Sequence, residues 1–171
     1  MSAKPLISFE EVAEENPYFL CPTECPDWKS VFGNDHPLKI DIGFGGGSFL
    51  LEMAIREPEC NFVGLDMYHK GIRKIVTRID KLMIQNIRIV YGDAREKFPV
   101  IFKDGELSSI YINFPDPWPK KRHSKRRLIK PAFVHLLSNK LKQGGKIHVA
   151  TDHESYAEEI LYYFESEDSL K

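Results

Sequence analysis

Short apolar runs alternate with longer segments of helical periodicity from residue 38 onward. The runs predict strands over residues 38–42, 61–65, 87–90, 107–112 and 146–150. Helices are expected between them over 48–56, 70–83, 126–141 and 155–164, with a short helix or loop over 94–102. Pro131 interrupts the third of these helices or delays its start, and Gly144-Gly145 is expected to end it. The alternation is typical of an α/β protein with a doubly wound, mostly parallel, Rossmann-like sheet.

The first 37 residues differ from the rest because prolines break up any regular pattern. We expect an N-terminal arm over 1–37 with irregular and short helical segments, and a single domain over 38–171. Residues 9–16 have a weak helical pattern, and the spacing of Trp28, Val31 and Phe32 predicts a short turn of helix packed on the domain. Structural cover is the favoured role of the arm, and closure over a ligand is the alternative.

Composition limits the classes of partner. The 171 residues include 24 Lys+Arg and 25 Asp+Glu, a net charge of -1, so binding to a nucleic acid would need a local cationic patch. We find neither a signal peptide nor an apolar run near the ~18 residues of a membrane span, and we expect a cytoplasmic protein. Cys21 and Cys25 have no second pair of ligands at zinc-site spacing, so reduced thiols are favoured and no metal is expected.

Polar and glycine residues follow each predicted strand. They are Asp41–Gly47, Asp66, Asp93, Asn113–Asp116 and Thr151-Asp152. Because right-handed crossovers bring the carboxyl ends of parallel strands to one edge, these residues are expected to meet there.

Gly43, Gly45 and Gly47 form a turn between a strand and a helix, where a ligand can approach the backbone closely. A dinucleotide fingerprint would place pyrophosphate here, but Asp41 would repel it. An acid at this position suits a cationic ligand such as S-adenosylmethionine, whose product is S-adenosylhomocysteine.

The next two strand ends suit the rest of a nucleoside. Asp66 has the spacing of a carboxylate that accepts ribose hydroxyls. Asp93 is expected to accept from an adenine amine while the Ala94 N–H donates to the ring. The alternative for such acids is helix capping.

The segment Asn113–Asp116 resembles the Asn-Pro-Pro-aromatic turn of amino-methyltransferases without matching it. Guanine N7 presents a lone pair and carries no hydrogen, so its methylation needs positioning and no acceptor for a proton. Asp116, and Asp152 at the next strand end, are suited to accept from the two donors on the guanine edge. They would also stabilise the positive charge that the base gains.

A cationic run follows Trp118 directly. It comprises Lys120, Lys121, Arg122, His123, Lys125, Arg126, Arg127 and Lys130. Its position beside the predicted site favours contact with RNA phosphates over a merely solvated face. A second stripe, Lys70, Lys74, Arg78 and Lys81, has helical spacing and leaves both interpretations open. Trp118 would stack on a base or pack against the protein.

These segments together are similar to the bacterial tRNA (guanine-N7)-methyltransferases, a family of class I methyltransferases. The similar segments are 41–47, 64–66, 92–94, 114–127 and 150–157. The resemblance implies methyl transfer from S-adenosylmethionine to a guanine in the tRNA variable loop. It also implies that Asp41, Asp66 and Asp93 bind the methyl donor, that Asp116 is the active-site acid, and that Lys120 and Asp152 contact the substrate.

The complete set of candidates combines the resemblance with the residues themselves. The catalytic candidate is Asp116. The donor-binding candidates are Asp41, Gly43, Gly45, Gly47, Asp66, Asp93, Ala94 and Asn113. The substrate-binding candidates are Lys120, Lys121, Arg122, Arg126, Arg127 and Asp152.

The chain departs from the family in two ways. Asp41 and Asp66 stand where the family usually has Glu, which keeps the charge. The family's antiparallel C-terminal hairpin is expected to be missing, which would leave 146–150 as an edge strand. A methyltransferase acting on another RNA base or a small molecule, or a non-catalytic RNA-binding subunit, are the alternatives. The residues leave open the oligomeric state, the tRNAs chosen and the roles of Cys21 and Cys25.

Overall fold

The structure, a computed structural model, describes residues 16–170, which build an α/β fold around one parallel sheet. Among these residues the sheet has six strands in the order β1-β4-β3-β2-β5-β6, and every neighbouring pair is parallel. Their bounds in that order are Phe19–Leu20, Ile87–Tyr91, Asn61–Asp66, Leu38–Ile42, Leu107–Asn113 and Leu141–Ala150. The predicted strands and fold class are confirmed.

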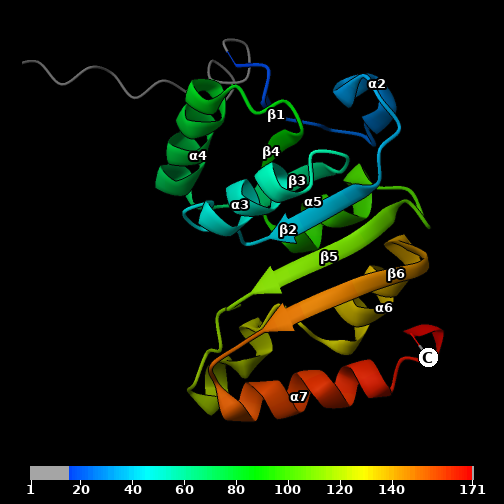
Figure 1. Cartoon of the computed structure of the whole chain (residues 1–171). Coiled ribbons are helices and arrows are strands. Elements are labelled where there is room, and N and C mark those ends of the chain that lie inside the picture. Colours follow the sequence, from blue (N-terminus) through cyan, green and yellow to red (C-terminus); the bar gives the residue numbers. More distant parts are fainter. Residues whose placement is uncertain (1–15, 171) are drawn as a thin grey trace, which may run out of the picture.

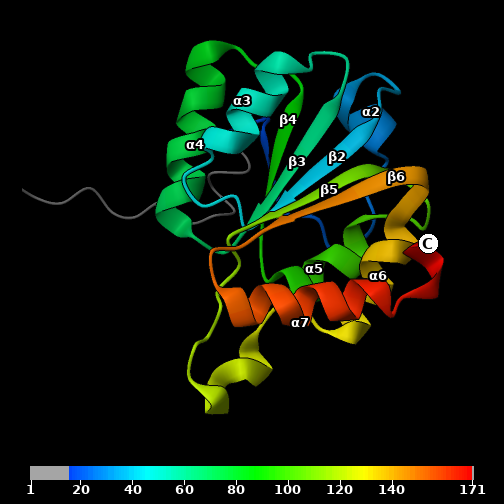
Figure 2. The same ribbon diagram turned by 60° about the horizontal axis from the view of Figure 1, so that its bottom comes forward.

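Helices cover both faces of the sheet, as Figures 1 and 2 show. One face carries α3 (Ser48–Arg56) and α4 (His69–Leu82), and the other carries α5 (Ala94–Ile101), α6 (Pro131–Lys140) and α7 (Glu154–Glu165). The short α2 (Trp28–Phe32) and two 3-10 helices, η1 (Lys121–Arg126) and η2 (Asp168–Leu170), complete the described elements. The sheet is therefore doubly wound, as predicted.

The central strands are apolar on both sides because each side meets a layer of helices. Ile40 of β2 and Ile89 of β4 are fully buried. One core joins the sheet to α5, α6 and α7 through residues such as Phe98, Leu137 and Tyr156, and the other joins it to α3 and α4. The two cores fix the strands, and thereby the loops at their carboxyl ends.

Part of the predicted arm belongs to the sheet, which corrects the expectation of an irregular segment. Phe19 and Leu20 form β1, which pairs with Ile89 and Val90 of β4. The predicted short helix is confirmed as α2: the Trp28 indole stacks on Phe102 at 5.5 Å and donates to the Ile101 carbonyl at 2.8 Å. The weak helical pattern of residues 9–16 lies, apart from its last residue, outside the described residues.

Near the end of the chain, the delayed start of a helix at Pro131 is confirmed as one of the two alternatives, and its expected end is corrected. The helix predicted over 126–141 begins only at Pro131, because proline fits the first turn of a helix and not its interior. It ends at Lys140, and Gly144-Gly145 lie within β6, where the register with β5 shifts. Among the described residues β6 has one neighbour, β5, so it is an edge strand as expected. None of the described helices has the length and apolarity to cross a membrane.

The glycine turn between β2 and α3 packs closely on α4. A Cβ on Gly71 of α4 would lie 2.0 Å from the Gly45 carbonyl oxygen, and one on Gly47 would lie 2.3 Å from Ile75 Cδ1. Gly43, Gly45 and Gly47 have φ values of 76°, 55° and 74°, in the left-handed region that favours glycine. The turn therefore depends on glycines in two elements.

We predict that Gly71→Ala destabilises the protein. Alanine in a helix interior normally stabilises by about 1 kcal/mol relative to glycine. Here the overlap of the new Cβ with the Gly45 carbonyl should make the substitution destabilising instead. It should lower the free energy of unfolding by about 1–3 kcal/mol. Urea denaturation measures the change. Thr77→Ala, at an exposed position of the same helix, is the control and should be neutral or slightly stabilising; a stabilised Gly71→Ala would contradict the close contact.

Candidate functional site

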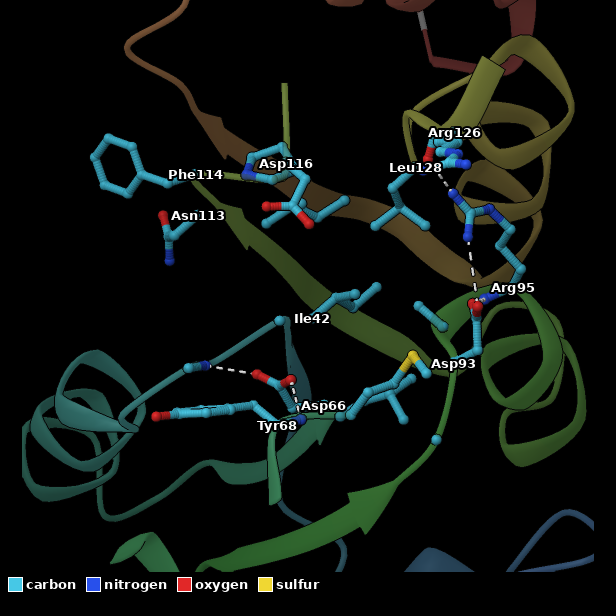
Figure 3. A pocket seen from close by; sticks show the side chains of 18 of the residues that line it. Ile42, Asp66, Tyr68, Asp93, Arg95, Asn113, Phe114, Asp116, Arg126 and Leu128 are labelled. Carbon is cyan, nitrogen blue, oxygen red and sulfur yellow. Dashed lines mark hydrogen bonds and ion pairs between the residues drawn. The ribbon is translucent and has the colours of Figure 1, made fainter. Parts of the chain in front are cut away.

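A cavity of about 710 Å³ lies at the carboxyl ends of the strands, beside β2 (Figure 3). The strand order reverses there, since β2 lies between β3 and β5. This is the crevice in which open α/β sheets bind ligands. Its lining includes the predicted residues Gly43, Gly45, Asp66, Asp93, Ala94, Asn113, Asp116 and Arg126. The structure thus brings eight of the predicted residues to one cavity.

Asp66, at the end of β3, holds the glycine turn. Its Oδ2 accepts from the Gly45 N–H at 2.6 Å, and its Oδ1 accepts from the Tyr68 N–H at 2.8 Å. A carboxylate has about four acceptor sites, so each oxygen keeps capacity for a ligand hydroxyl. Asp66 therefore shapes the turn and still presents acceptors to the cavity.

Asp93, at the end of β4, caps α5, the alternative that the sequence left open. Its Oδ1 accepts from the Arg95 N–H at 2.8 Å, and its Oδ2 lies 3.4 Å from Arg95 Nη1. The Ala94 N–H begins α5 and has no partner within the helix, because the first N–H groups of a helix cannot have one. This end of the cavity thus offers a carboxylate and a helix N-terminus.

Arg95 also connects the two sides of the cavity. Its Nη2 donates to the Arg126 carbonyl in η1 at 2.5 Å while Nη1 faces Asp93 (Figure 3). Arg95 was not predicted as a site residue, because no pattern in the sequence distinguishes it from other arginines near a helix start.

Asp41, in β2, is buried beneath the turn and does not belong to the cavity lining. It is 1% exposed, and neither carboxylate oxygen has a hydrogen-bond partner among the described residues. Burial, reinforced by the nearby Asp66 carboxylate, raises the pKa of Asp41 from 3.8 to about 7. A negative charge here is costly, and a cation in the cavity would stabilise it.

The segment after β5 forms the opposite wall. The Phe114 N–H donates to the Ala150 carbonyl at 2.8 Å, and Phe114 and Trp118 have φ values of 51° and 44°. Asp116 is exposed and lies across the cavity from Asp66 (Figure 3). Asn113 Nδ2 is buried and has no acceptor among the described residues. This wall therefore offers an exposed acid and an amide donor without an acceptor.

The cationic run lies mostly on η1, next to this wall. Lys125 and Arg126 line the cavity and are exposed, and the Arg126 guanidinium lies 5.0 Å from the Trp118 ring. Lys120, Arg122 and Asp152 are exposed outside the lining. Gly47 is also outside it, and the Lys121 side chain lies outside the described part of the structure. The exposed members of the run, Lys120, Arg122, Lys125 and Arg126, thus form a cationic rim beside the cavity, where Trp118 contacts Arg126 and His123.

Arg127 corrects the sequence prediction of a phosphate contact. The residue is 7% exposed, its Nε donates to the Pro117 carbonyl at 2.7 Å, and its Nη1 pairs with Glu159. Lys130 pairs with the same glutamate. The second predicted stripe lies on α4, where Lys70, Lys74 and Lys81 are exposed and Arg78 is half-buried.

Apolar residues around the cavity were not predicted as site residues. Met67 and Tyr68, which follow Asp66, are 54% and 52% exposed and line the cavity together with Ile42, Leu65 and Leu128. For Met67 and Tyr68, the position just after the end of a strand was the one signal in the sequence that could have identified them as site residues. Within residues 16–170 no cluster of His, Cys, Asp and Glu has the form of a metal site, and Cys25 and Cys60 are free thiols.

The raised pKa of Asp41 predicts a pH dependence of stability. Between pH 4 and 7 the folded chain holds a proton on Asp41 that the unfolded chain releases, so this group lowers stability as pH rises. Asp41→Asn should remove that loss and raise the free energy of unfolding at pH 8 by about 2–4 kcal/mol, since each pKa unit is worth about 1.4 kcal/mol.

Urea denaturation of both proteins at pH 4, 6 and 8 provides the measurement. The difference between them should shrink towards pH 4. Asp35→Asn, at an exposed position, is the control and should shift stability by less than about 0.5 kcal/mol at every pH. A pH-independent effect of Asp41→Asn would show that Asp41 is ionised throughout.

Comparisons with known proteins identify the family. The family model described as "Putative methyltransferase" matches residues 35–171. The tRNA (guanine-N(7)-)-methyltransferase of Photobacterium profundum is 42% identical over 135 residues, which are 79% of this chain and 55% of that protein. The enzyme of the same name from Paraburkholderia xenovorans is 41% identical over 160 residues, 92% of this chain and 62% of that protein. The chain thus spans 55% and 62% of the length of these curated relatives.

A solved structure supports the fold. The precorrin-6y C5,15-methyltransferase of Geobacter metallireducens superposes with a TM-score of 0.61 at 16% identity, over 86% of this chain and 75% of that one. At this identity the likeness concerns the fold alone. The match of the family model over most of the sequence shows more: the chain belongs to this methyltransferase family.

Proposed function

We propose that the protein transfers a methyl group from S-adenosylmethionine to N7 of a guanine in the variable loop of tRNA. One observation carries the proposal. Asp66 and Asp93, which suit a nucleoside, line the same cavity as Asp116, which is followed in the sequence by the cationic rim. The names of the 41–42% identical relatives agree with it. A cavity of about 710 Å³ also lies within the usual range for small-ligand sites, about 300–1,000 Å³.

The residues of the donor half fit S-adenosylmethionine. Asp66 keeps acceptor capacity for the ribose hydroxyls, and the Ala94 N–H and Asp93 carboxylate suit the edge of adenine. Asp41 acts from beneath the turn, where its unpaired carboxylate favours a cationic ligand in the cavity. Asn113 Nδ2 would donate to a ligand acceptor, which would satisfy a buried amide.

When bound, S-adenosylmethionine supplies an electrophilic methyl group on its sulfonium and leaves as S-adenosylhomocysteine. The chain's own contribution is to hold the base in line with that methyl group. Asp116 accepts from the ring N–H and amine of guanine, and Asp152 assists from the next strand end. As N7 gains the methyl group the base becomes positive, and these carboxylates stabilise the charge. Neither needs to remove a proton, because N7 carries none.

The cationic rim binds the RNA around the target base. Lys120, Arg122, Lys125 and Arg126 are exposed beside the wall that carries Asp116. Trp118, with the Arg126 guanidinium over its ring, offers an aromatic face to a base. Phosphate contacts here position the tRNA, while selection of guanine depends on Asp116.

We predict that Asp116→Ala abolishes N7-methylguanosine formation while binding of S-adenosylhomocysteine persists. The donor half is built from other strand ends, so it should remain intact. Nucleoside analysis of unmodified tRNA after incubation with methyl-labelled donor measures the first effect, and calorimetry measures the second. Glu158→Gln, which removes an exposed acid on α7, is the control and should retain activity.

The same assay separates the alternatives. Retention of N7-methylguanosine by Asp116→Ala would contradict the assigned role. A different methylated nucleoside in the wild-type reaction would identify another target base, and failure to bind S-adenosylhomocysteine would identify a non-catalytic RNA-binding protein.

We also predict that the rim residues act through phosphates. Each phosphate contact to single-stranded RNA contributes about 0.7 to the slope of log affinity against log salt concentration. Lys125→Ala and Arg126→Ala should each weaken tRNA binding and reduce that slope by about this amount in filter-binding titrations. Lys103→Ala, an exposed cation just before β5 at the opposite edge of the sheet, should change neither quantity.

A further inference from the structure

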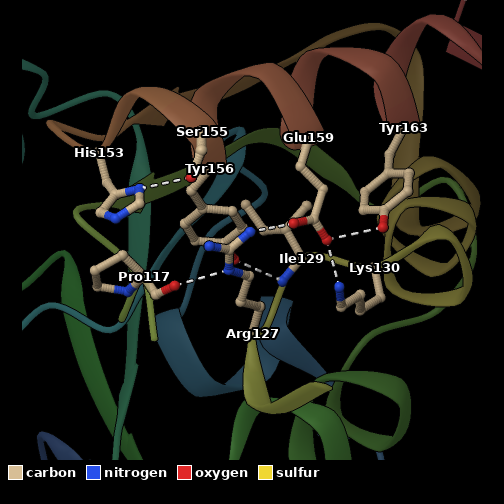
Figure 4. A network of polar contacts seen from close by, with 9 residues as sticks. All are labelled: Pro117, Arg127, Ile129, Lys130, His153, Ser155, Tyr156, Glu159 and Tyr163. Atoms are coloured by element: carbon tan, nitrogen blue, oxygen red, sulfur yellow. Dashed lines mark hydrogen bonds and ion pairs between the residues drawn. The ribbon is translucent and has the colours of Figure 1, made fainter. Parts of the chain in front are cut away.

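Arg127 is a charged residue held in the interior beside the candidate site. Its side chain makes three contacts: Nε donates to the Pro117 carbonyl at 2.7 Å, Nη1 pairs with Glu159, and the guanidinium lies 4.6 Å from the centre of the Tyr156 ring (Figure 4). With 7% of its surface exposed, it is poorly placed for a nucleic-acid backbone. Its neighbour Arg126 is exposed and lines the cavity.

Glu159 anchors Arg127 to α7. It also accepts from Lys130 Nζ and from the Tyr163 hydroxyl, the latter at 2.8 Å. Its partial burial opposes ionisation, but the hydrogen bonds from Lys130, Tyr163 and Arg127 outweigh that effect and lower the pKa of Glu159. The carboxylate therefore stays ionised at neutral pH and presents a fixed acceptor to Arg127.

Arg127 in turn restrains the segment that carries Asp116. Its target, the Pro117 carbonyl, lies between Asp116 and Trp118, and Trp118 has a φ of 44° that side chains disfavour. Prolines at 115 and 117 have no N–H with which to hold the segment. A hydrogen bond from a charged, anchored donor is a strong restraint at this point.

We propose that Arg127 is a positioning residue: with Glu159 it fixes the Pro117 carbonyl to α7, and thereby sets where Asp116 meets the target base. It contacts no RNA. The role in methyl transfer rests on the proposed function, whereas the restraint on residues 114–120 is a property of the fold and has its own test.

Kinetics of Arg127→Lys, Arg127→Met and Glu159→Gln on tRNA test the catalytic consequence. Lysine cannot reproduce the fork that reaches the carbonyl and the carboxylate together, and methionine keeps only the packing on Tyr156. All three variants should lower kcat, by about 10- to 100-fold for Arg127→Lys, because small misplacements of reacting groups have effects of that size. Their KM for tRNA should be unchanged.

Salt titrations of tRNA binding decide between positioning and phosphate contact. Arg127→Met should keep the wild-type slope, whereas the matched variant Arg126→Met should lose about 0.7 of it. A reduced slope and raised KM for Arg127→Met, with kcat retained, would overturn the proposal.

Hydrogen exchange tests the restraint without relying on methyl transfer. Amides in 114–120 should exchange faster in Arg127→Met and Glu159→Gln than in wild type. Glu158→Gln, which changes the exposed acid next to Glu159 on α7, should leave them unchanged. Unchanged exchange in Arg127→Met, with S-adenosylhomocysteine binding intact, would overturn the proposal. Faster exchange in a protein that methylates nothing would support the restraint and reject the proposed function instead.

A variant that merely unfolds is recognised by fast exchange everywhere and loss of S-adenosylhomocysteine binding. In that case Glu159→Gln tests the proposal instead, because glutamine keeps the size of the residue and an acceptor for Lys130 and Tyr163. Local acceleration in 114–120 with a lowered kcat supports positioning, and wild-type exchange and kcat in this variant overturn it.

Discussion

Backbone hydrogen bonds hold β2 in register between β3 and β5, so Ile42 lies beside Leu65 on one side and Ile112 on the other. Parallel strands joined by helical crossovers must end at the same edge. The loops continue this pairing, since the Gly43 N–H donates to the Leu65 carbonyl and the Phe114 N–H donates to the Ala150 carbonyl. The glycine turn and the segment with Asp116 are therefore both tied to a neighbouring strand end, across one cavity.

Acids gather at one side of that cavity and cations border the other, where Asp116 is the one acid described, in a protein with a net charge of only -1. Asp41, Asp66 and Asp93 face or underlie the donor side, and the cations of η1 border the other. Arg95 lies between them and makes a contact on each side, with Asp93 and with the Arg126 carbonyl. The separation suits a cationic small molecule next to a polyanion, since each is attracted to its own side.

The sequence predicted this edge well because its signals are local. Apolar runs ending in Asp or Gly mark strand ends, and the topology follows from their alternation with helices. The sequence predicted the structure less well where tertiary packing, and not a local pattern, determines it. Two residues, Phe19 and Leu20, are too short a run to show as a strand, and Gly144-Gly145 suggested a helix end where β6 forms. Asp41 was expected to face a ligand, but its place in a strand covered on both sides buries it. Arg127 was indistinguishable in sequence from the cations that precede it.

The buried pair of Arg127 and Glu159 has no evident purpose as a source of stability. Removing two charges from water costs about as much as their attraction returns, and well-packed apolar residues would serve as well. An apolar pair, however, could not donate to the Pro117 carbonyl, which would then be left without this partner at the edge of the site. The charge is explained by the geometry that it imposes on the segment between Asp116 and Trp118. Through Arg127, α7 is tied to the wall that carries Asp116, although it contributes no residue to the lining of the cavity.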